Sequence, residues 1–280
     1  MITASQENVR KAILLVSWCL AVAITAAAQQ PGTLHIPEDP QQDGPAANPG
    51  RPTISTPATL TPAGYFQFET GYLGAWHSPE FSSQSSVNEV VKFSVSRRIE
   101  LQAELSPFAR SAIGTQSANG TGSVSLGVQG LLLQGGGARP ALALSYFRQV
   151  SSGNTPDLDI GSPKNSAIVL VSADVKGFHY DSNFLFNDTI EGATHRAQFG
   201  QTLSVSHGLG GKFGLSGEIW HFTQPFLRRR AVGTLWALNY NARKNLVIDS
   251  GFDRGLTRTS TRWEVFVGFT YVLPHKARLH

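Results

Sequence analysis

The last strand-like segment of this chain, residues 261–273, alternates between two kinds of side chain with a period of two. Apolar side chains occupy every second position: Trp263, Val265, Val267, Phe269 and Tyr271. The positions between them hold Arg262, Glu264, Phe266, Gly268 and Thr270. Successive side chains of a strand point to opposite faces, so the pattern predicts a strand with one apolar face. That face meets a core in a soluble protein, but lipid in an outer-membrane barrel, whose other face lines a wet lumen.

Twelve segments with this rhythm follow one another along the chain, separated by turn residues. They cover approximately 63–76, 86–96, 99–108, 121–134, 139–150, 166–176, 178–187, 194–207, 212–223, 230–241, 245–254 and 261–273. Tight connections follow every second segment, at 97–98, 135–137, 176–177, 208–211 and 242–244. Mostly longer, polar connections lie between them, at 77–85, 109–120, 151–165, 188–193, 223–229 and 255–260.

This alternation of short turns and long loops is typical of an outer-membrane barrel, whereas a soluble β-sandwich has no reason to alternate. The sequence therefore predicts an all-β fold, a closed antiparallel transmembrane β-barrel of about 12 strands. Closure is required because an open edge would leave N–H and C=O groups unpaired in hydrocarbon. An even number of strands places both ends of the barrel chain on the periplasmic side.

Residues 1–28 read as a secretory signal peptide. Arg10 and Lys11 precede an apolar run, Ala12–Ile24, and small residues, 26–28, stand before Gln29. An uncleaved membrane anchor is the alternative, but the run is shorter than the ~20 residues of a membrane span. Cys19 would suit a lipoprotein, but the bulky Trp18 stands before it, so we set that interpretation aside.

Prolines punctuate residues 29–62, which we interpret as a periplasmic linker that is extended or disordered. The sequence leaves open whether this linker enters the lumen as a plug. Residues 63–280 then form the outer-membrane β-barrel.

Charge and cysteine usage exclude several classes of protein. The formal net charge of +4 falls to +3 when the leader, with two bases and one acid, is removed. The sequence has no cluster of Lys and Arg on a predicted helix that would indicate a nucleic-acid partner. The single Cys and single Met both lie in the leader, so the mature chain has no disulfides and no thiolate chemistry.

The predicted location is the cell outer membrane, where the partners are lipid, lipopolysaccharide and a small-molecule solute. An arginine run, 228–230, would lie at the external mouth, where contact with lipopolysaccharide competes with simple solvation.

The phase of the alternation predicts which charged side chains line the lumen. These are Glu69, Lys92, Glu104, Asp174, His179, Asp181, Arg196, Glu218, Asp249, Asp253, Arg262 and Glu264. Acids outnumber bases, which would give a pore a weak cation preference. A closed network of paired charges is an equal alternative, because a twelve-strand barrel is only modestly wider than one that side chains fill.

The opposite phase predicts aromatic side chains near strand ends, where the girdles of a barrel meet lipid headgroups. The predicted membrane-interface aromatics are Tyr72, Tyr146, Tyr240, Trp263 and Tyr271.

Catalytic signals are weak throughout the chain. A barrel lipid hydrolase needs a Ser and a His on one face, but Ser206 and His207 are adjacent and point to opposite faces. His179 and Asp181 share a face, but two ligands do not make a metal site. We therefore predict no catalytic residue, no metal and no cofactor.

Residues 51–75 carry a local similarity to a known family. Arg51-Pro52 and a Ser/Thr-rich stretch precede a Pro-x-Gly turn at 62–64, and a strand with Phe66, Phe68, Glu69 and Gly71 follows. This segment resembles the start of the outer-membrane family associated with the meta-pathway of phenol degradation, whose members are described as transporters. The usual Asp before Arg-Pro is Gly50 here. The resemblance implies a β-barrel and uptake of small, aromatic or hydrophobic molecules, with no catalytic residues to transfer.

Together these patterns predict a barrel that passes small molecules through the outer membrane. Two alternatives stay open: a lipid-modifying hydrolase, and a plugged barrel with a structural or adhesive role. The oligomeric state and the solute are not encoded in any pattern that we find.

Overall fold

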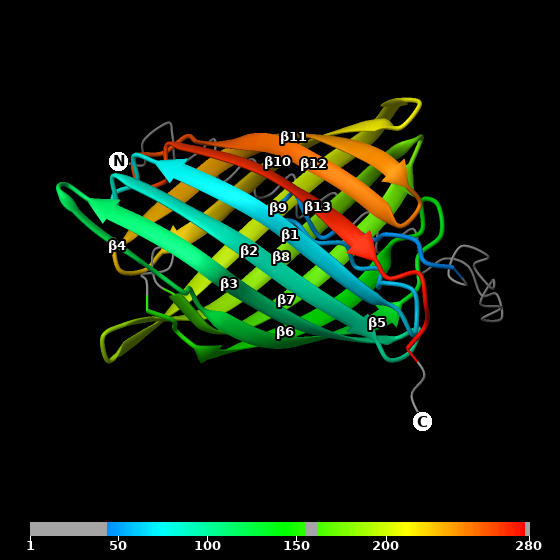
Figure 1. Cartoon of the computed structure of the whole chain (residues 1–280), viewed down its shortest axis with the longest axis horizontal. Helices are drawn as coiled ribbons and strands as arrows, with labels where there is room; N and C mark the ends of the chain where they lie inside the picture. Colours follow the sequence, from blue (N-terminus) through cyan, green and yellow to red (C-terminus); the bar gives the residue numbers. More distant parts are fainter. Residues whose placement is uncertain (1–43, 155–161, 278–280) are drawn as a thin grey trace, which may run out of the picture. The chain divides into compact units, whose positions relative to one another are not determined.

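Twelve antiparallel strands close into a barrel because the first strand pairs with the last. The computed structural model describes residues 44–154 and 162–277. Strand β1 (Phe66–Trp76) bonds β13 (Trp263–Val272) on one side and β2 (Ser83–Ser94) on the other. The ring is visible in Figure 1, where β13 in red lies beside β1 in cyan.

The remaining strands follow in chain order around the ring. Their bounds are β3 (Ile99–Ile113), β4 (Gln116–Gly120), β5 (Val124–Leu133), β6 (Ala141–Ser151), β7 (Ser162–Val175), β8 (Phe178–Glu191), β9 (Thr194–Gly210), β10 (Phe213–Gln224), β11 (Arg229–Arg243) and β12 (Leu246–Gly255). The sheet of the described residues has 13 strands, but β4 bonds only β3, so twelve strands make the ring.

The predicted fold class is confirmed, and each of the twelve predicted segments overlaps one strand of the ring. The strand β4 was not predicted. Residues 109–120 were expected to form a loop, but β3 continues through Ile113 and β4 folds back along it in a hairpin. Residues 188–193 were also expected to form a loop, yet β8 and β9 extend to within two residues of each other.

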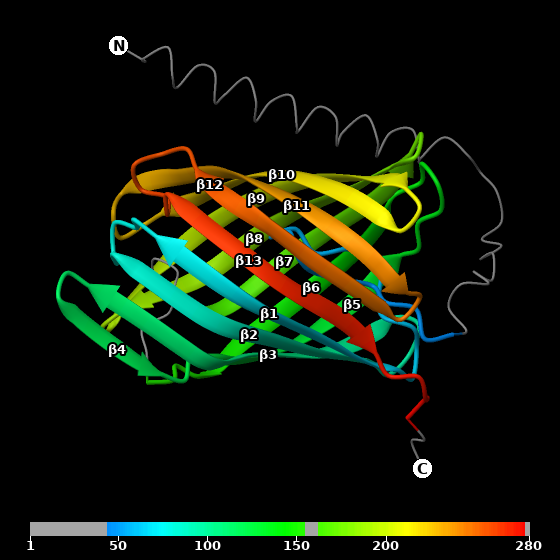
Figure 2. The ribbon, with the colours of Figure 1, turned by 45° about the horizontal axis from the view of Figure 1, so that its top comes forward.

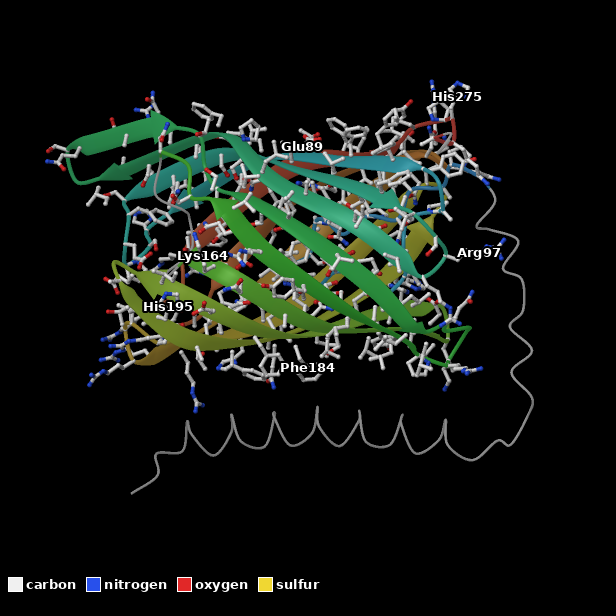
Figure 3. The ribbon with its side chains drawn as sticks, turned by 90° about the horizontal axis from the view of Figure 1, so that it is seen from below. Glu89, Arg97, Lys164, Phe184, His195 and His275 are labelled. Carbon is white, nitrogen blue, oxygen red and sulfur yellow. The ribbon has the colours of Figure 1, made fainter. Side chains whose placement is uncertain are left out.

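The two ends of the barrel differ in their connections. At one end, called the turn end, the connections are 95–98, 134–140, 176–177, 211–212 and 244–245. The tightest contains Lys176 and Gly177, both with positive φ, which is the backbone of a two-residue hairpin turn. The other end, called the loop end, carries the connections after β1, β3, β6, β8, β10 and β12. Figure 3 shows Arg97 and His275 at the turn end and Lys164 and His195 at the loop end.

The two faces of the wall are opposite to those of a soluble protein. Large apolar side chains remain exposed on the outer face, among them Val267 at 51% and Phe186 at 53%. Polar side chains are buried on the inner face, among them Gln67 at 0% and Glu69 at 3%. In Figure 3 the labelled Phe184 points away from the barrel. This arrangement is what a hydrocarbon surrounding would require.

The predicted signal peptide, 1–28, and the first part of the predicted linker, 29–43, lie outside the described residues. In the part of the chain that is described, no helix is long and apolar enough to cross a membrane.

Candidate functional site

The chain enters its own barrel before the first strand begins. Residues 48–61, called the lumen segment, bond inward-pointing side chains of the wall, and Figure 2 shows this part of the chain, in blue, inside the barrel. The segment contains Pro52 and Pro57 and pairs with no strand. Its backbone N–H groups therefore need acceptors other than a ladder, because a buried, unpaired N–H is costly.

Carboxylates of the wall supply many of these acceptors. Glu218 on β10 accepts hydrogen bonds from the N–H groups of Ile54 and Ser55, each at 2.7 Å. The Ser55 hydroxyl donates to the same carboxylate at 2.5 Å and lies 2.7 Å from Thr202 Oγ1. Glu100 on β3 accepts from the N–H of Thr61 at 2.8 Å. The acids of this wall thus act as hydrogen-bond acceptors for the backbone of the lumen segment.

Glu69 on β1 combines this role with an ion pair. Its carboxylate accepts from the N–H of Gly50 at 3.0 Å, from Gln67 Nε2 at 2.7 Å and from Lys92 Nζ at 2.5 Å. All three wall side chains are buried. A buried charge is tolerated only when it is paired and hydrogen-bonded, and this cluster meets both conditions.

Arg51 fixes the segment to the neighbouring part of the inner wall, at β12 and β13. Its Nε and Nη2 donate to the two carboxylate oxygens of Asp249 at 2.9 and 3.0 Å. The guanidinium lies over Gly71 and Gly268, which are paired partners on β1 and β13. A Cβ at Gly71 would lie 2.0 Å from Nη1, and a Cβ at Gly268 would lie 2.5 Å from Nη2. The two glycines therefore leave the space that the guanidinium occupies, and a larger side chain at either position would fill it.

The later part of the lumen segment is held by amides, a hydroxyl and apolar contacts. Asn183 on β8 accepts from Thr56 N at 2.7 Å and donates to Thr56 O at 2.9 Å. Ser172 Oγ accepts from Ala58 N at 2.7 Å. Ala58 and Leu60 pack with a cluster on the inner wall that consists of Leu131, Ala141, Ala143, Leu170 and Ile168. Apolar burial here adds to the hydrogen bonds.

Residues 44–62 are the last part of the predicted linker, and within them residues 48–61 bond the inner wall of the barrel. The composition lacks apolar content for a core of its own, but the segment uses the barrel wall as its partner. Its hydrogen bonds to the wall join residues 19 to 198 positions apart in sequence, as for Gly50 with Glu69 and Arg51 with Asp249. Local composition cannot indicate such distant partners.

A cavity of 640 Å³ lies between the lumen segment and the inner wall. Besides Tyr72, four aromatic residues of the wall line it: Phe147, Trp220, Phe222 and Phe266. Each stands directly across from a glycine of the neighbouring strand, namely Gly127, Gly233, Gly200 and Gly251. A Cβ at those glycines would come within 2.1 to 2.7 Å of the ring atoms. The rings therefore occupy the space above the glycines instead of crossing the lumen.

Four of the predicted lumen residues hold the lumen segment or its partners. Glu69, Lys92, Glu218 and Asp249 are all buried and form the contacts described above. Their charges are thus used within the protein.

Three further predicted residues, Glu104, Asp253 and Glu264, line the cavity. Glu104 is exposed to it, and Asp253 accepts a hydrogen bond from Trp220 Nε1 at 2.5 Å. Asp253 and Glu264 are direct cross-strand partners.

Three others gather near the turn end. His179 Nδ1 lies 2.8 Å from Asp174 Oδ1, and Nε2 lies 3.2 Å from Asp181 Oδ1. Asp181 Oδ1 also accepts from Ser172 Oγ at 2.5 Å. The group therefore continues the network that reaches Ala58. Within the described ranges, no group of three or more side chains is placed to hold a metal ion.

The two predicted arginines lie at the loop end. Arg196 donates to Pro225 O at 2.8 Å and its guanidinium lies 5.2 Å from the centre of the Phe226 ring. Arg262 is exposed and precedes β13, and its carbonyl accepts from Arg254 Nη1 at 3.0 Å.

The five predicted interface aromatics project from β1, β6, β11 and β13. Tyr72, Tyr146 and Trp263 are exposed, whereas Tyr240 and Tyr271 are half-buried. Arg254 lies 4.3 Å above the ring of Trp263, and Tyr146 donates its hydroxyl to Asn165 at 2.9 Å.

Sequence reasoning placed Phe266 on the inner face, but it missed the three other inward aromatics and the lumen segment. A signal for the aromatics is present, because each ring has the inward phase and faces a glycine of the same phase on a neighbouring predicted strand. The signal for the segment is absent, since its partners are dispersed along the whole chain.

No protein-family model matches this chain, and no curated protein does. Solved structures do match. An outer membrane channel from Pseudomonas putida F1 is 12% identical, with a TM-score of 0.54 over 80% of this chain and 99% of that chain. The KdgM porin in complex with disordered oligogalacturonate is 9% identical, with a TM-score of 0.50 over 76% and 99%. The NanC porin is 9% identical, with a TM-score of 0.50 over 74% and 98%. The likeness establishes that this barrel shares the fold of outer-membrane channels and porins.

Proposed function

We propose that this chain is a non-catalytic outer-membrane channel for small molecules and that the lumen segment controls passage. The observation that carries the proposal is a closed barrel with an apolar outer face and an inner cavity bounded by the segment. The fold shared with porins and channels supports it. The loop end would face the outside and the arginines of 228–230 would meet lipopolysaccharide there.

The ring-lined cavity favours solutes with a flat apolar body. Aromatic and apolar side chains bury such a body without requiring hydrogen bonds from it. This agrees with the family resemblance of residues 51–75, and we propose membership of that family. Export by the leader, 1–28, is part of the same proposal.

A plugged barrel with a structural role is the second candidate. It is favoured by the number of wall side chains that bond the segment, since every one of these bonds opposes its movement. The two candidates differ in whether the segment leaves its place during function.

A reversible disulfide separates them. The pair Ser55→Cys and Thr202→Cys would join two side chains whose oxygens lie 2.7 Å apart, in a mature chain without other cysteines. In a channel, solute flux into proteoliposomes should fall on oxidation and recover with a reductant. The single variants control for the substitutions. Flux that is absent in both states, from a barrel that still shows heat-dependent gel mobility, would favour the structural role.

A further inference from the structure

We propose that the cavity is a binding site for a small organic ammonium ion with a flat apolar body. The inference rests on the proposed function and names a class of solute for it. Three independent features of the cavity wall carry it: ring faces, acceptor oxygens without donors, and an excess of carboxylates.

The ring faces provide one part of the site. Trp220 and Phe222 lie on β10, and Phe147 and Phe266 lie on β6 and β13. Because each ring occupies the space above a glycine, it presents an aromatic surface toward the cavity. Aromatic faces bind apolar bodies and also attract cations, through the negative charge of the ring face.

Two acceptor oxygens provide the second part. Asn187 and Gln224 line the cavity and are each 92% buried, since their exposure is 8%. Asn187 Oδ1 and Gln224 Oε1 have no hydrogen-bond partner among the described residues. A buried acceptor without a donor is unfavourable, because it has lost its hydrogen bonds to water. Both oxygens are covered in this structure, so each amide would have to turn toward the cavity to meet a solute. A solute with N–H groups would then remove this cost, and a hydrocarbon would not.

The strand register places these acceptors beside the rings. Asn187 on β8 is the direct partner of Gln198 on β9, and its Nδ2 donates to Gln198 Oε1 at 2.9 Å. The next inward row contains Leu185, Gly200 and Phe222, which are direct partners across the same three strands. Amide and aromatic surfaces are therefore adjacent on one part of the wall.

Charge provides the third part and selects a cation. Glu104, Asp253 and Glu264 line the cavity. The two basic side chains among the described lining residues are Arg51 and Lys92, and both are paired, with Asp249 and Glu69. The carboxylates of the cavity thus exceed its cations. An anionic solute would be repelled, while an ammonium ion would gain both the charge and the acceptors.

Three probes with the same phenyl body test this inference: 2-phenylethylammonium, 2-phenylethanol and phenylacetate. The full barrel in detergent would be titrated with each by calorimetry. The ammonium ion should bind about tenfold more tightly than the alcohol, and phenylacetate should not bind measurably. Equal or tighter binding of the alcohol, binding of phenylacetate, or no binding of the ammonium ion would overturn the proposal.

Variants locate the binding. Asp253→Asn should weaken binding of the ammonium ion and leave the alcohol unchanged, and Glu104→Gln should do the same. Glu104→Gln also covers the case in which Asp253→Asn fails to fold, because Asp253 holds Trp220. The double variant Asn187→Leu/Gln224→Leu should weaken both ligands. Asp188→Asn is the matched control, because Asp188 does not line the cavity and contacts His195 at 2.9 Å. Loss of binding in this control alone, or in none of the variants, would contradict the assignment.

Binding and flux are measured separately, so the two proposals can fail separately. Binding without any flux would refute the channel and leave the site intact. Flux of neutral solutes without binding of the ammonium ion would leave the channel intact and refute the site.

Discussion

Two regions of the inner wall use the same residue types in opposite ways. Where the lumen segment lies, the acids and amides are satisfied by the chain itself, as Glu218 and Asn183 are by Ile54 and Thr56. Around the cavity, Asn187 Oδ1 and Gln224 Oε1 have no donor within residues 44–154 and 162–277. The difference shows that a surplus of polar side chains inside a barrel has more than one cause. One part of the wall is complementary to the backbone of the protein, and the other part has acceptors that the described residues leave without a donor.

The largest effect on docking of the lumen segment is expected at the ion pair between Arg51 and Asp249. Asp249→Ala would leave the guanidinium unpaired in the lumen, at a cost of about 3–5 kcal/mol to the docking of the segment. We expect the segment to detach while the barrel remains closed. Conductance in planar bilayers should rise, and a cysteine introduced by Thr53→Cys should become reactive to thiol reagents.

The double variant Arg51→Met/Asp249→Ala is the control for this experiment, because it removes both charges together. It should regain part of the docking. Unchanged conductance and an unreactive cysteine in Asp249→Ala would show that the ion pair does not hold the segment.

Glu218→Leu should have the next largest effect. It removes the acceptor of the Ile54 and Ser55 N–H groups, at about 1–3 kcal/mol for each unsatisfied group. The same thiol-reactivity assay measures the loss. Glu218→Gln keeps an acceptor oxygen and should lose less; equal losses in the two variants would exclude hydrogen bonding to the carboxylate as the cause.

Gly200→Ala tests the cavity side of the comparison. Its Cβ would lie 2.4 Å from Phe222 Cε1, so the ring must move into the cavity. Overpacking of this kind costs about 1–3 kcal/mol, and the open side of the cavity should keep it near the lower value. The midpoint of thermal unfolding and the affinity for 2-phenylethylammonium should both fall. Gly208→Ala, which would meet no atom within 4 Å, should change neither.

The smallest effect is expected outside the lumen. Arg254→Ala removes a cation–π contact with Trp263 and a hydrogen bond to Arg262 O. At an exposed site the ring contact is worth about 0.5–1 kcal/mol. A small decrease in the thermal midpoint with unchanged conductance is expected, whereas altered conductance would link the outer face to the lumen.

The strands and their two faces could be predicted from the sequence because both follow from a local period. Alternation assigns Glu69 to one face and Phe68 to the other without knowledge of any partner. The tight turns were equally local, as Lys176 and Gly177 illustrate. The hairpin that includes β4 was missed because residues 116–120 carry no alternation of apolar side chains.

The lumen segment and the cavity could not be derived in this way. Their contacts join positions far apart in sequence, and the roles of their acids depend on those contacts. Glu218 and Glu104 have the same predicted phase, yet one binds the backbone of the segment and the other faces the cavity. Ser55 and Glu218 meet because the barrel is closed, which no local pattern in the sequence indicates.

The aromatic rings above glycines have a consequence for how this barrel can change over generations. A ring and the glycine across from it form one unit, because a larger residue at the glycine displaces the ring, and loss of the ring leaves a gap. The two positions should therefore vary together among relatives, Trp220 with Gly233 and Phe266 with Gly251. If the ring and the glycine changed places between the two strands, the width of the lumen would be preserved. A change at only one of the two positions would alter that width.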